Sequence, residues 1–539
     1  MEARGNAGTA IKEHQGSTET RPPHKEKINS VTQIETVETL KRRMAETKAL
    51  NGAADVLGWD QQTYMPTGGG EARAEQITAL SKVIHQMATG RETEGLLEAA
   101  EREAKDLDPD DDDAAYLRVA RRDFDRTAKM PEELVARYAR ITTLGYEAWH
   151  EARAASDYGK FAPWLEQILG LSREVAELRG YKESIYDALL DEYEPGMTAS
   201  DVQGMFDAIK PNLVALVQAV SEPKARAVDD GVLKRDFDEA HQEAFGRAVV
   251  SALGFDWTRG RQDRAVHPFC TSFTRGDVRI TTRFERNFLP AALFGSMHET
   301  GHALYEQGVA GRYDGNVLGG GTSLGVHESQ SRLWENLVGR SRPFWQAFYP
   351  DLQAAFPDQL GSVAPNDWYR AINKVEPSLI RVEADEVTYN LHILLRFEME
   401  VALLEGRVSV ADAPQLWNAK TEEYLGLTPP DDAHGILQDV HWSGGGIGYF
   451  PTYSVGNLLS VQLFEAANEA LGGEVSAQIA RKEFGPLHDW LQENIYQYGR
   501  KYDPRALVQR VTGRPLDPAP YLRYLQAKFG DVYGLSGKG

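Results

Sequence analysis

Apolar residues recur at helical spacing through most of the chain, beginning at Val37. This pattern predicts long amphipathic helices, separated by clusters of Gly, Pro and Asp, in segments that include 37–59, 71–87, 131–153 and 201–220. The residues before them are polar, rich in Gly, Thr, Lys and Glu, and lack any periodicity. We therefore expect a disordered polar tail over residues 1–35 and a single large helical domain over residues 36–539.

One segment has the pattern of a strand. β-Branched residues gather in DVRITTRF, residues 277–284, between Gly276 and the turn-like ERNFLP. A helical pattern follows at once, and Pro290 and Gly308 are typical of the first turn and the end of a helix. The expected fold class is therefore mainly α, with a small β-sheet just before the helix at 290–308.

That helix contains two histidines four residues apart, in HETGH at 298–302. On a helix, His298 and His302 leave the same face about one turn apart, close enough to bind one metal ion. Glu299 is rotated from His298 by about 100° around the helix axis. This H-E-x-x-H arrangement indicates a metal site, and its alternative is an ordinary helix with two hydrogen-bonded histidines.

Composition limits the setting and the partners. With 539 residues, 42% of them hydrophobic, the chain can bury a large core. No stretch approaches the apolar length of a membrane span, and the N-terminus lacks the apolar core of a secretory signal, so we expect a cytoplasmic protein without a membrane partner. A net charge of −21 argues against a nucleic-acid partner. The single cysteine, Cys270, excludes an intrachain disulfide.

A catalytic zinc ion needs three protein ligands and an open position for water. Glu306 continues the face of His302 along the same helix, so it competes poorly with a ligand from a second helix. A glycine-rich loop, 315–325, leads into such a helix, VHESQSRLWENLVGR at 326–340. Spacing alone leaves three residues open as the third ligand: Glu328, His327 and Glu335.

Further motifs accompany the histidine helix along the chain. In order, they are WDQQTYMP (59–66), HPF (267–269), DVRIT (277–281), HETGH (298–302), HESQSR (327–332), IRVEAD (380–385) and GILQDVHW (435–442). With this ordered set the chain resembles the carboxypeptidase Taq family, the M32 metallocarboxypeptidases. The resemblance covers most of the chain outside the predicted tail.

The resemblance implies a helical metallopeptidase fold of two lobes flanking a deep active-site cleft, commonly assembled as a homodimer. It also implies the release of C-terminal amino acids from peptides with a free C-terminus. One divalent metal ion per chain is expected, Zn²⁺ first, with Co²⁺ or Mn²⁺ as alternatives because two histidines and a glutamate suit all three.

Matched residue by residue, the resemblance makes His298, His302 and Glu328 the metal ligands. It makes Glu299 the general base and acid. Proton transfer by a carboxylate beside an activated water agrees with that assignment, because such a group can take the proton during attack and later deliver it to the leaving amine.

The loop at 435–453 offers donors for the oxyanion of the reaction. Its glycines at 444–446 permit a tight bend, and Tyr449, Tyr453 and His441 can each donate a hydrogen bond to developing negative charge. Similarity to related helical zinc peptidases favours Tyr453 together with His441. Packing of the loop against the core is the alternative for either tyrosine.

Arg381 and Asp385 are four residues apart in an apparent helix, for which a surface ion pair is the simplest interpretation. The resemblance instead makes Arg381 the anchor of the substrate's C-terminal carboxylate, assisted by Gln438, with Arg279 and His267 shaping the cleft. Two other functions stay open: a helical zinc endopeptidase or dipeptidase, and a metal-binding scaffold without catalysis.

Overall fold

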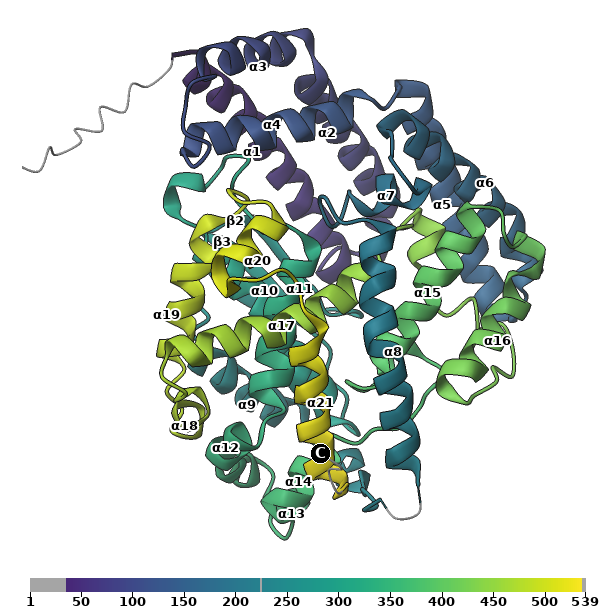
Figure 1. The fold of residues 1–539 in the computed structure, drawn as a ribbon, viewed down its shortest axis with the longest axis vertical. Helices are drawn as coiled ribbons and strands as arrows, with labels where there is room; N and C mark the ends of the chain where they lie inside the picture. Colours follow the sequence, from purple (N-terminus) through teal and green to yellow (C-terminus); the bar gives the residue numbers. More distant parts are fainter. Residues whose placement is uncertain (1–34, 223–224, 536–539) are drawn as a thin grey trace, which may run out of the picture.

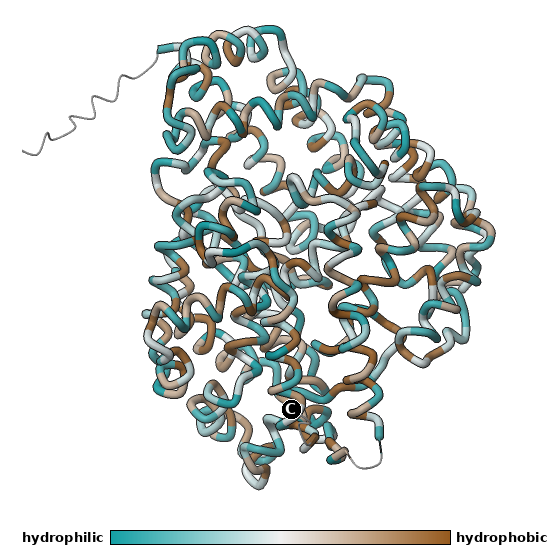
Figure 2. The backbone as a smooth tube through the Cα atoms, in the orientation of Figure 1, coloured by the Kyte–Doolittle hydropathy of each residue, from teal (hydrophilic) through white to brown (hydrophobic). Residues whose placement is uncertain are grey.

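The computed structural model describes residues 35–222 and 225–535. The predicted polar tail lies outside the described residues, except for Glu35, where the first helix begins. Among the described residues no helix is long and apolar enough to cross a membrane. Hydrophilic and hydrophobic residues are interleaved within individual helices (Figure 2), as the amphipathic pattern predicts.

Helices make up most of the described chain (Figure 1). In chain order they are α1 (Glu35–Thr63), α2 (Gly70–Thr89), α3 (Arg91–Glu103), α4 (Asp112–Ala128), α5 (Glu132–Ala155), α6 (Tyr158–Arg179), α7 (Ile185–Leu190), α8 (Ala199–Ser221), α9 (Glu239–Ala252), α10 (Leu289–Gly308), α11 (Leu324–Arg332), α12 (Arg342–Ala355), α13 (Pro357–Leu360), α14 (Pro365–Ala371), α15 (Tyr389–Leu404), α16 (Ala413–Leu425), α17 (Pro451–Ala470), α18 (Val475–Ala480), α19 (Gly485–Asn494), α20 (Pro504–Thr512) and α21 (Pro518–Tyr533).

Shorter helical turns join these elements. A π-helical segment, η4 (Leu333–Gly339), continues α11 directly. The 3-10 turns are η1 (Thr67–Gly69), η2 (Gly231–Lys234), η3 (Gly311–Tyr313), η5 (Arg381–Glu383), η6 (Val410–Asp412), η7 (His441–Gly444) and η8 (Tyr496–Tyr498). The four segments predicted as long amphipathic helices lie in α1, α2, α5 and α8, so that prediction is confirmed.

Local sequence sets where these helices begin. At α8, the Thr198 hydroxyl accepts the Asp201 backbone N–H at 3.2 Å, and the Asp201 carboxylate accepts the Thr198 backbone N–H at 2.9 Å. This reciprocal pair satisfies two donors that a helix start leaves free. At α10, Pro290 lies in the first turn, where a missing N–H costs nothing.

A three-stranded sheet precedes α10. Its strands are β1 (Gly260–Arg264), β2 (Cys270–Thr274) and β3 (Asp277–Thr282), in the order β1-β3-β2. β1 runs parallel to β3, and β2 runs antiparallel to it. Val278 and Ile280 of β3 form one apolar cluster with Ala303 of α10, so the sheet supports the outer face of the histidine helix.

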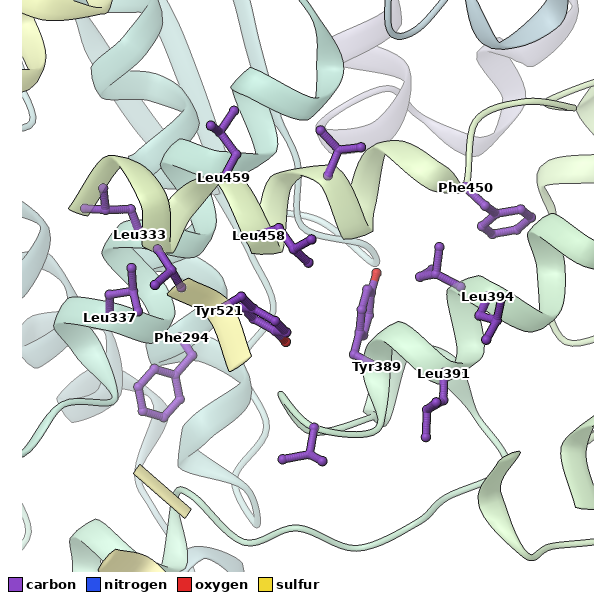
Figure 3. Packing of buried hydrophobic residues seen from close by; sticks show 14 of the residues in the cluster. Phe294, Leu333, Leu337, Tyr389, Leu391, Leu394, Phe450, Leu458, Leu459 and Tyr521 are labelled. Atoms are coloured by element: carbon purple, nitrogen blue, oxygen red, sulfur yellow. The ribbon is translucent and has the colours of Figure 1, made fainter. Parts of the chain in front are cut away.

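The largest apolar core joins helices from distant parts of the chain, including α6, α8, α10, α15, α17 and α21. Figure 3 shows part of it, where the Tyr389 ring of α15 stands between Leu458 of α17 on one side and Leu391 and Leu394 of α15 on the other. A second cluster belongs to α1, α3 and α4 and reaches the residues that follow α10. The mainly helical fold with a small sheet is thus confirmed.

Candidate metal centre and active site

The two histidines of α10 meet a glutamate of α11. One ligand atom each from His298, His302 and Glu328 lies within 4.8 Å of the others. The Glu328 Oε2 atom is 3.5 Å from the Nε2 atom of His298 and 3.5 Å from that of His302. Ligands bound at roughly 2.1 Å in a tetrahedron stand about 3.4 Å apart, so this group fits one divalent ion.

Two glycines allow the close helix packing that brings Glu328 to the histidines. A Cβ atom on Gly301 of α10 would lie 2.4 Å from the Gln330 carbonyl oxygen of α11. A Cβ atom on Gly456 of α17 would lie 2.5 Å from Glu328 Cγ. Because side chains at these two positions would push the helices apart, the glycines fix α11 between α10 and α17.

Hydrogen bonds behind the imidazole rings leave both Nε2 atoms free for a metal ion. His298 Nδ1 is 3.0 Å from Glu335 Oε2. His302 Nδ1 is 2.6 Å from His327 Nδ1, and His327 Nε2 is 2.8 Å from Glu306 Oε1. With protons on His298 Nδ1, His302 Nδ1 and His327 Nε2, every contact is a hydrogen bond and both ligand Nε2 atoms keep their lone pairs.

The same contacts separate the three candidates for the third ligand. His327 and Glu335 lie behind the rings, against the Nδ1 atoms, whereas Glu328 faces the Nε2 atoms. Glu306, the weaker candidate on α10, supports His327 instead. Glu328 therefore remains the predicted third ligand.

Charges around this group differ from one side chain to the next. Burial alone would raise the pKa of the Glu328 carboxyl, but Arg332 and His298 outweigh it and hold that pKa well below its usual value. Arg332 Nε donates to Glu328 Oε1 at 2.7 Å. Burial lowers the pKa of His302 to about 4, so its ring is neutral at pH 7, as a metal ligand must be.

Glu299 lies on α10 next to the candidate ligand His298 and is only 6% exposed. Burial raises the pKa of its carboxyl to about 7, and the nearby Glu328 acts in the same direction. A carboxyl with a pKa near the working pH can both accept and deliver a proton. The structure therefore places a group suited to acid–base chemistry beside the candidate metal ligands.

The predicted oxyanion donors lie together around the loop before α17. The Tyr453 hydroxyl is 3.4 Å from His441 Nε2. The Tyr449 ring packs against both, with centroid distances of 5.3 Å to Tyr453 and 5.3 Å to His441. Burial lowers the pKa of His441 to about 4, so the imidazole is neutral at pH 7.

Arg381 is not on a helix with Asp385, so the interpretation as a surface ion pair is wrong. It stands in the short turn η5, and the Asp385 carboxylate instead accepts backbone N–H groups, including those of Val387 and Thr388. Asp385 stabilises the turn before α15 in this way, because a side-chain carboxylate caps the free N–H groups there.

The guanidinium of Arg381 is 5% exposed and is held by two partners. It donates to Asp439 Oδ1 at 2.8 Å and to the Tyr389 hydroxyl at 2.8 Å. Asp439 also accepts from Arg396 Nε at 2.6 Å. Two buried guanidinium groups thus share one carboxylate, which leaves an excess of positive charge.

Tyr389 connects this cluster to the metal-ligand group. Its ring lies under the Arg332 guanidinium, with 4.8 Å between the Arg332 Cζ atom and the ring centroid, while its hydroxyl accepts from Arg381. Arg332 in turn donates to Glu328. The candidate carboxylate anchor and the candidate metal ligand therefore lie on either side of one tyrosine.

The remaining predicted substrate-binding residues take other positions. Gln438 Oε1 accepts the Arg381 backbone N–H at 2.9 Å, and its amide donates to the Leu379 carbonyl at 3.0 Å, so Gln438 holds the Arg381 turn. Arg279 pairs with Asp277 of its own strand and lies over the Trp59 ring. His267 is exposed in the connection between β1 and β2.

Sequence reasoning missed Asp439, Tyr389 and Arg396, which hold Arg381 in place. Asp439 stands inside the QDVHW motif, so its place in that motif could have indicated a functional role. Arg396 stands alone in the apolar run LHILLRF of α15, and a charge within such a run signals a buried partner. For Tyr389 the sequence holds no comparable signal.

A groove runs beside this site, between the N-terminal helices and the sheet. Two cavities of about 720 and 410 Å³ adjoin each other, and both are lined by Asn51 and Asp55 of α1 and by Cys270 and Thr271 of β2. The smaller cavity extends to Glu306 and His327, directly behind His302. The smaller cavity therefore lies on the Nδ1 side of the His302 ring, away from the Nε2 atom that faces Glu328.

A helical fold that gathers two histidines, a glutamate and a buried second glutamate in this way defines a metal-dependent hydrolase. The family model of carboxypeptidase Taq (M32) metallopeptidases matches residues 39–529. The chain therefore belongs to the M32 family, as its motifs indicated, and is a peptide hydrolase of the metallocarboxypeptidase type.

Individual relatives agree over nearly the whole length. Thermostable carboxypeptidase 1 of Thermus thermophilus is 42% identical over 499 residues, which cover 91% of this chain and 97% of that protein. Carboxypeptidase 1 of Bacillus subtilis is 39% identical over 481 residues, 89% of this chain and 95% of that protein. The crystal structure of an M32 carboxypeptidase from Deinococcus radiodurans superposes with a TM-score of 0.90 at 44% identity, covering 93% of this chain and all of that one.

Proposed function

We propose that the chain releases C-terminal residues one at a time from peptides with a free C-terminus, using one divalent metal ion per chain. The observation that carries this proposal is the buried pair of arginines, Arg381 and Arg396, which share the single carboxylate of Asp439 one tyrosine away from the metal-ligand group. A positive excess at that position favours an anionic end of the substrate over a continuing peptide chain.

His298, His302 and Glu328 would hold the metal ion, and the ligand set suits Zn²⁺ first, with Co²⁺ or Mn²⁺ as alternatives. When bound there, such an ion supplies Lewis-acid polarisation and lowers the pKa of water. Glu335 orients the His298 ring through its hydrogen bond to Nδ1. His327, itself held by Glu306, orients the His302 ring in the same way.

Glu299 takes the proton of the attacking water and later delivers it to the leaving amine. Its raised pKa, about 7, matches both steps, because a general base must be deprotonated before attack and protonated before the C–N bond breaks. Tyr453, with His441 behind its hydroxyl, donates to the developing oxyanion, and Tyr449 is the second candidate for this role.

Arg381 binds the C-terminal carboxylate of the substrate. A guanidinium has five N–H donors, and the contacts to Asp439 and Tyr389 use three of its nitrogen atoms but not all of these donors. Asp439 and Gln438 fix the group and its backbone, so little conformational freedom is lost on binding. Arg279 and His267 would shape the wall of the substrate cleft and would not contact the substrate's C-terminal carboxylate.

Replacing Arg381 by alanine should lower kcat/KM for free-acid peptides by about 2–5 kcal/mol, that is by roughly 30- to 5,000-fold. The wild type should hydrolyse a free-acid peptide and leave its C-terminally amidated twin intact, because the amide carries no charge for Arg381. Product analysis by mass spectrometry, with and without chelator, measures both. The metal content of the variant should equal that of the wild type.

Arg407→Ala is the matched control, because Arg407 is an exposed arginine whose partner is Glu405 at the surface. Equal hydrolysis of the two peptides by the wild type would instead support a helical zinc endopeptidase. A dipeptidase would release dipeptides or act only on dipeptides, and a metal-binding scaffold would show no turnover at all.

Three further properties belong to the same proposal. The family resemblance supports a homodimer, the single cysteine agrees with a reducing, cytoplasmic compartment, and the acidic net charge of −21 disfavours nucleic acid as a partner. Light scattering of the purified chain tests the dimer.

A further inference from the structure

Glu400 is a fully buried carboxylate on α15 that the proposed reaction does not use. It accepts three hydrogen bonds from three segments of the chain. The donors are the Tyr186 hydroxyl of α7 at 2.7 Å, Trp442 Nε1 at 2.9 Å and the Gly448 backbone N–H at 3.1 Å. Burial raises the pKa of this carboxyl to about 7, and the three hydrogen bonds act in the opposite direction, so they support its charged form.

Two of the donors bracket the loop that holds two of the candidate oxyanion donors, His441 and Tyr449. Trp442 directly follows His441, and Gly448 directly precedes Tyr449. The backbone of Gly448 is left-handed, with φ +90°, and a Cβ atom there would lie 2.8 Å from the Leu189 carbonyl carbon of α7. Glu400 thus holds both ends of the loop, and α7 packs against one of them.

The third donor, Tyr186, begins a segment that also touches the ligand helix. Farther along this segment, the Tyr193 ring packs on Tyr449 with a centroid distance of 5.1 Å, and its carbonyl accepts the Leu324 N–H at 3.0 Å. The Glu194 carboxylate accepts the Gly325 N–H at 2.9 Å. Leu324 and Gly325 form the first turn of α11, the helix of Glu328, so residues 185–194 join the loop to the ligand helix.

We propose that Glu400 is a positioning residue for peptide hydrolysis: its carboxylate locks the 441–449 loop onto the 185–194 segment and so sets His441 and Tyr449 relative to Glu328. The proposal rests on the proposed function of those residues. It adds a residue outside every motif of the sequence, acting through Trp442, Gly448 and Tyr186 and touching neither substrate nor metal ion.

The two acceptor oxygens of Glu400 matter because all three partners are donors. A carboxylate offers only acceptors, whereas a glutamine side chain must turn its NH₂ group towards at least one of them. Two donors then face each other in a buried site, and the loop must move to relieve the contact. A displacement of about 1 Å at a catalytic group lowers turnover by about 10²-fold.

The test compares Glu400→Gln with Glu398→Gln, a control on the same helix whose carboxylate contacts Lys420 and Tyr424 of α16. For Glu400→Gln we expect stoichiometric metal, KM within about threefold of wild type, and kcat lowered by about 10²-fold. Amide hydrogen exchange in residues 441–449 should be faster than in the control. Tyr186→Phe, which removes one donor and little volume, should lower kcat in the same direction.

A kcat within threefold of wild type in Glu400→Gln overturns the proposal, and so does a loss explained by metal content alone. If Glu400→Gln does not fold, Tyr186→Phe decides by the same criteria. If the wild type releases no C-terminal residue from any peptide, the proposed function fails. Amide hydrogen exchange in residues 441–449 then tests the positioning role alone. Faster exchange in Glu400→Gln than in Glu398→Gln supports that role, and equal exchange overturns it.

Discussion

Replacing Glu299 by glutamine should leave the metal content unchanged and lower kcat/KM for free-acid peptides by about 10²–10⁴-fold. Glutamine fills the same buried space, but its amide can neither accept the proton of the attacking water nor deliver one to the leaving amine. The proposed ligands His298, His302 and Glu328 stay in place, so metal binding and catalysis should separate in this variant. Atomic spectroscopy gives the metal content, and amino-acid release gives the rate.

Glu398→Gln again serves as the control, since it makes the same chemical change away from the site. If Glu299→Gln lost bound metal and turnover in parallel, Glu299 would be a metal ligand or a structural residue and not the general base. An unchanged rate would mean that another group moves the proton. In the wild type, burial raises the Glu299 pKa to about 7, so turnover should fall as pH drops through that value and Glu299 becomes protonated before attack.

The sequence predicts the histidine helix well and the sheet poorly. Pro290 and Gly308 bound a long amphipathic pattern, and α10 spans Leu289–Gly308. Of the three strands only β3 was predicted, at 277–284, and it ends at Thr282. β1 (GRQDR) and β2 (CTSFT) are short and largely polar, and each pairs only with β3, so neither shows the alternation that marks a half-buried strand.

The third metal ligand could not be chosen from spacing, because the choice depends on which side of two imidazole rings α11 reaches. Glu328, His327 and Glu335 are all within reach in sequence, yet they contact different nitrogen atoms of the rings. Helix packing places Glu328 at the Nε2 atoms, through the contact at Gly301 and the contact at Gly456. Packing of three helices is a long-range property that no local pattern contains.

Arg381 shows the opposite case, in which a local pattern misled. A spacing of four suggested a helical ion pair with Asp385, but Asp385 stabilises the turn before α15, and Arg381 is buried against Asp439, which is far away in sequence. The motif resemblance pointed to a role for Arg381 that periodicity could not. The predicted tail at 1–35 falls outside the described residues except for Glu35, which begins α1, and for residues 1–34 it remains a prediction.

Replacing Glu328 by alanine should remove both the bound metal and all measurable turnover, because two histidines alone cannot retain a divalent ion against water and buffer. Glu335→Gln gives the sharpest comparison. Glu335 lies behind His298 and orients its ring, so its loss should weaken metal affinity by about 10–100-fold while added Zn²⁺ restores activity.

The two variants therefore distinguish a ligand from its support. After removal of Glu328, Arg332 keeps Glu335 as a partner at 3.3 Å, so the buried guanidinium is not left unpaired and the fold should persist by circular dichroism. Metal titration followed by assay on a free-acid peptide measures both effects. Stoichiometric metal and normal turnover in Glu328→Ala, with both lost in Glu335→Gln, would exchange the two roles and make Glu335 the third ligand.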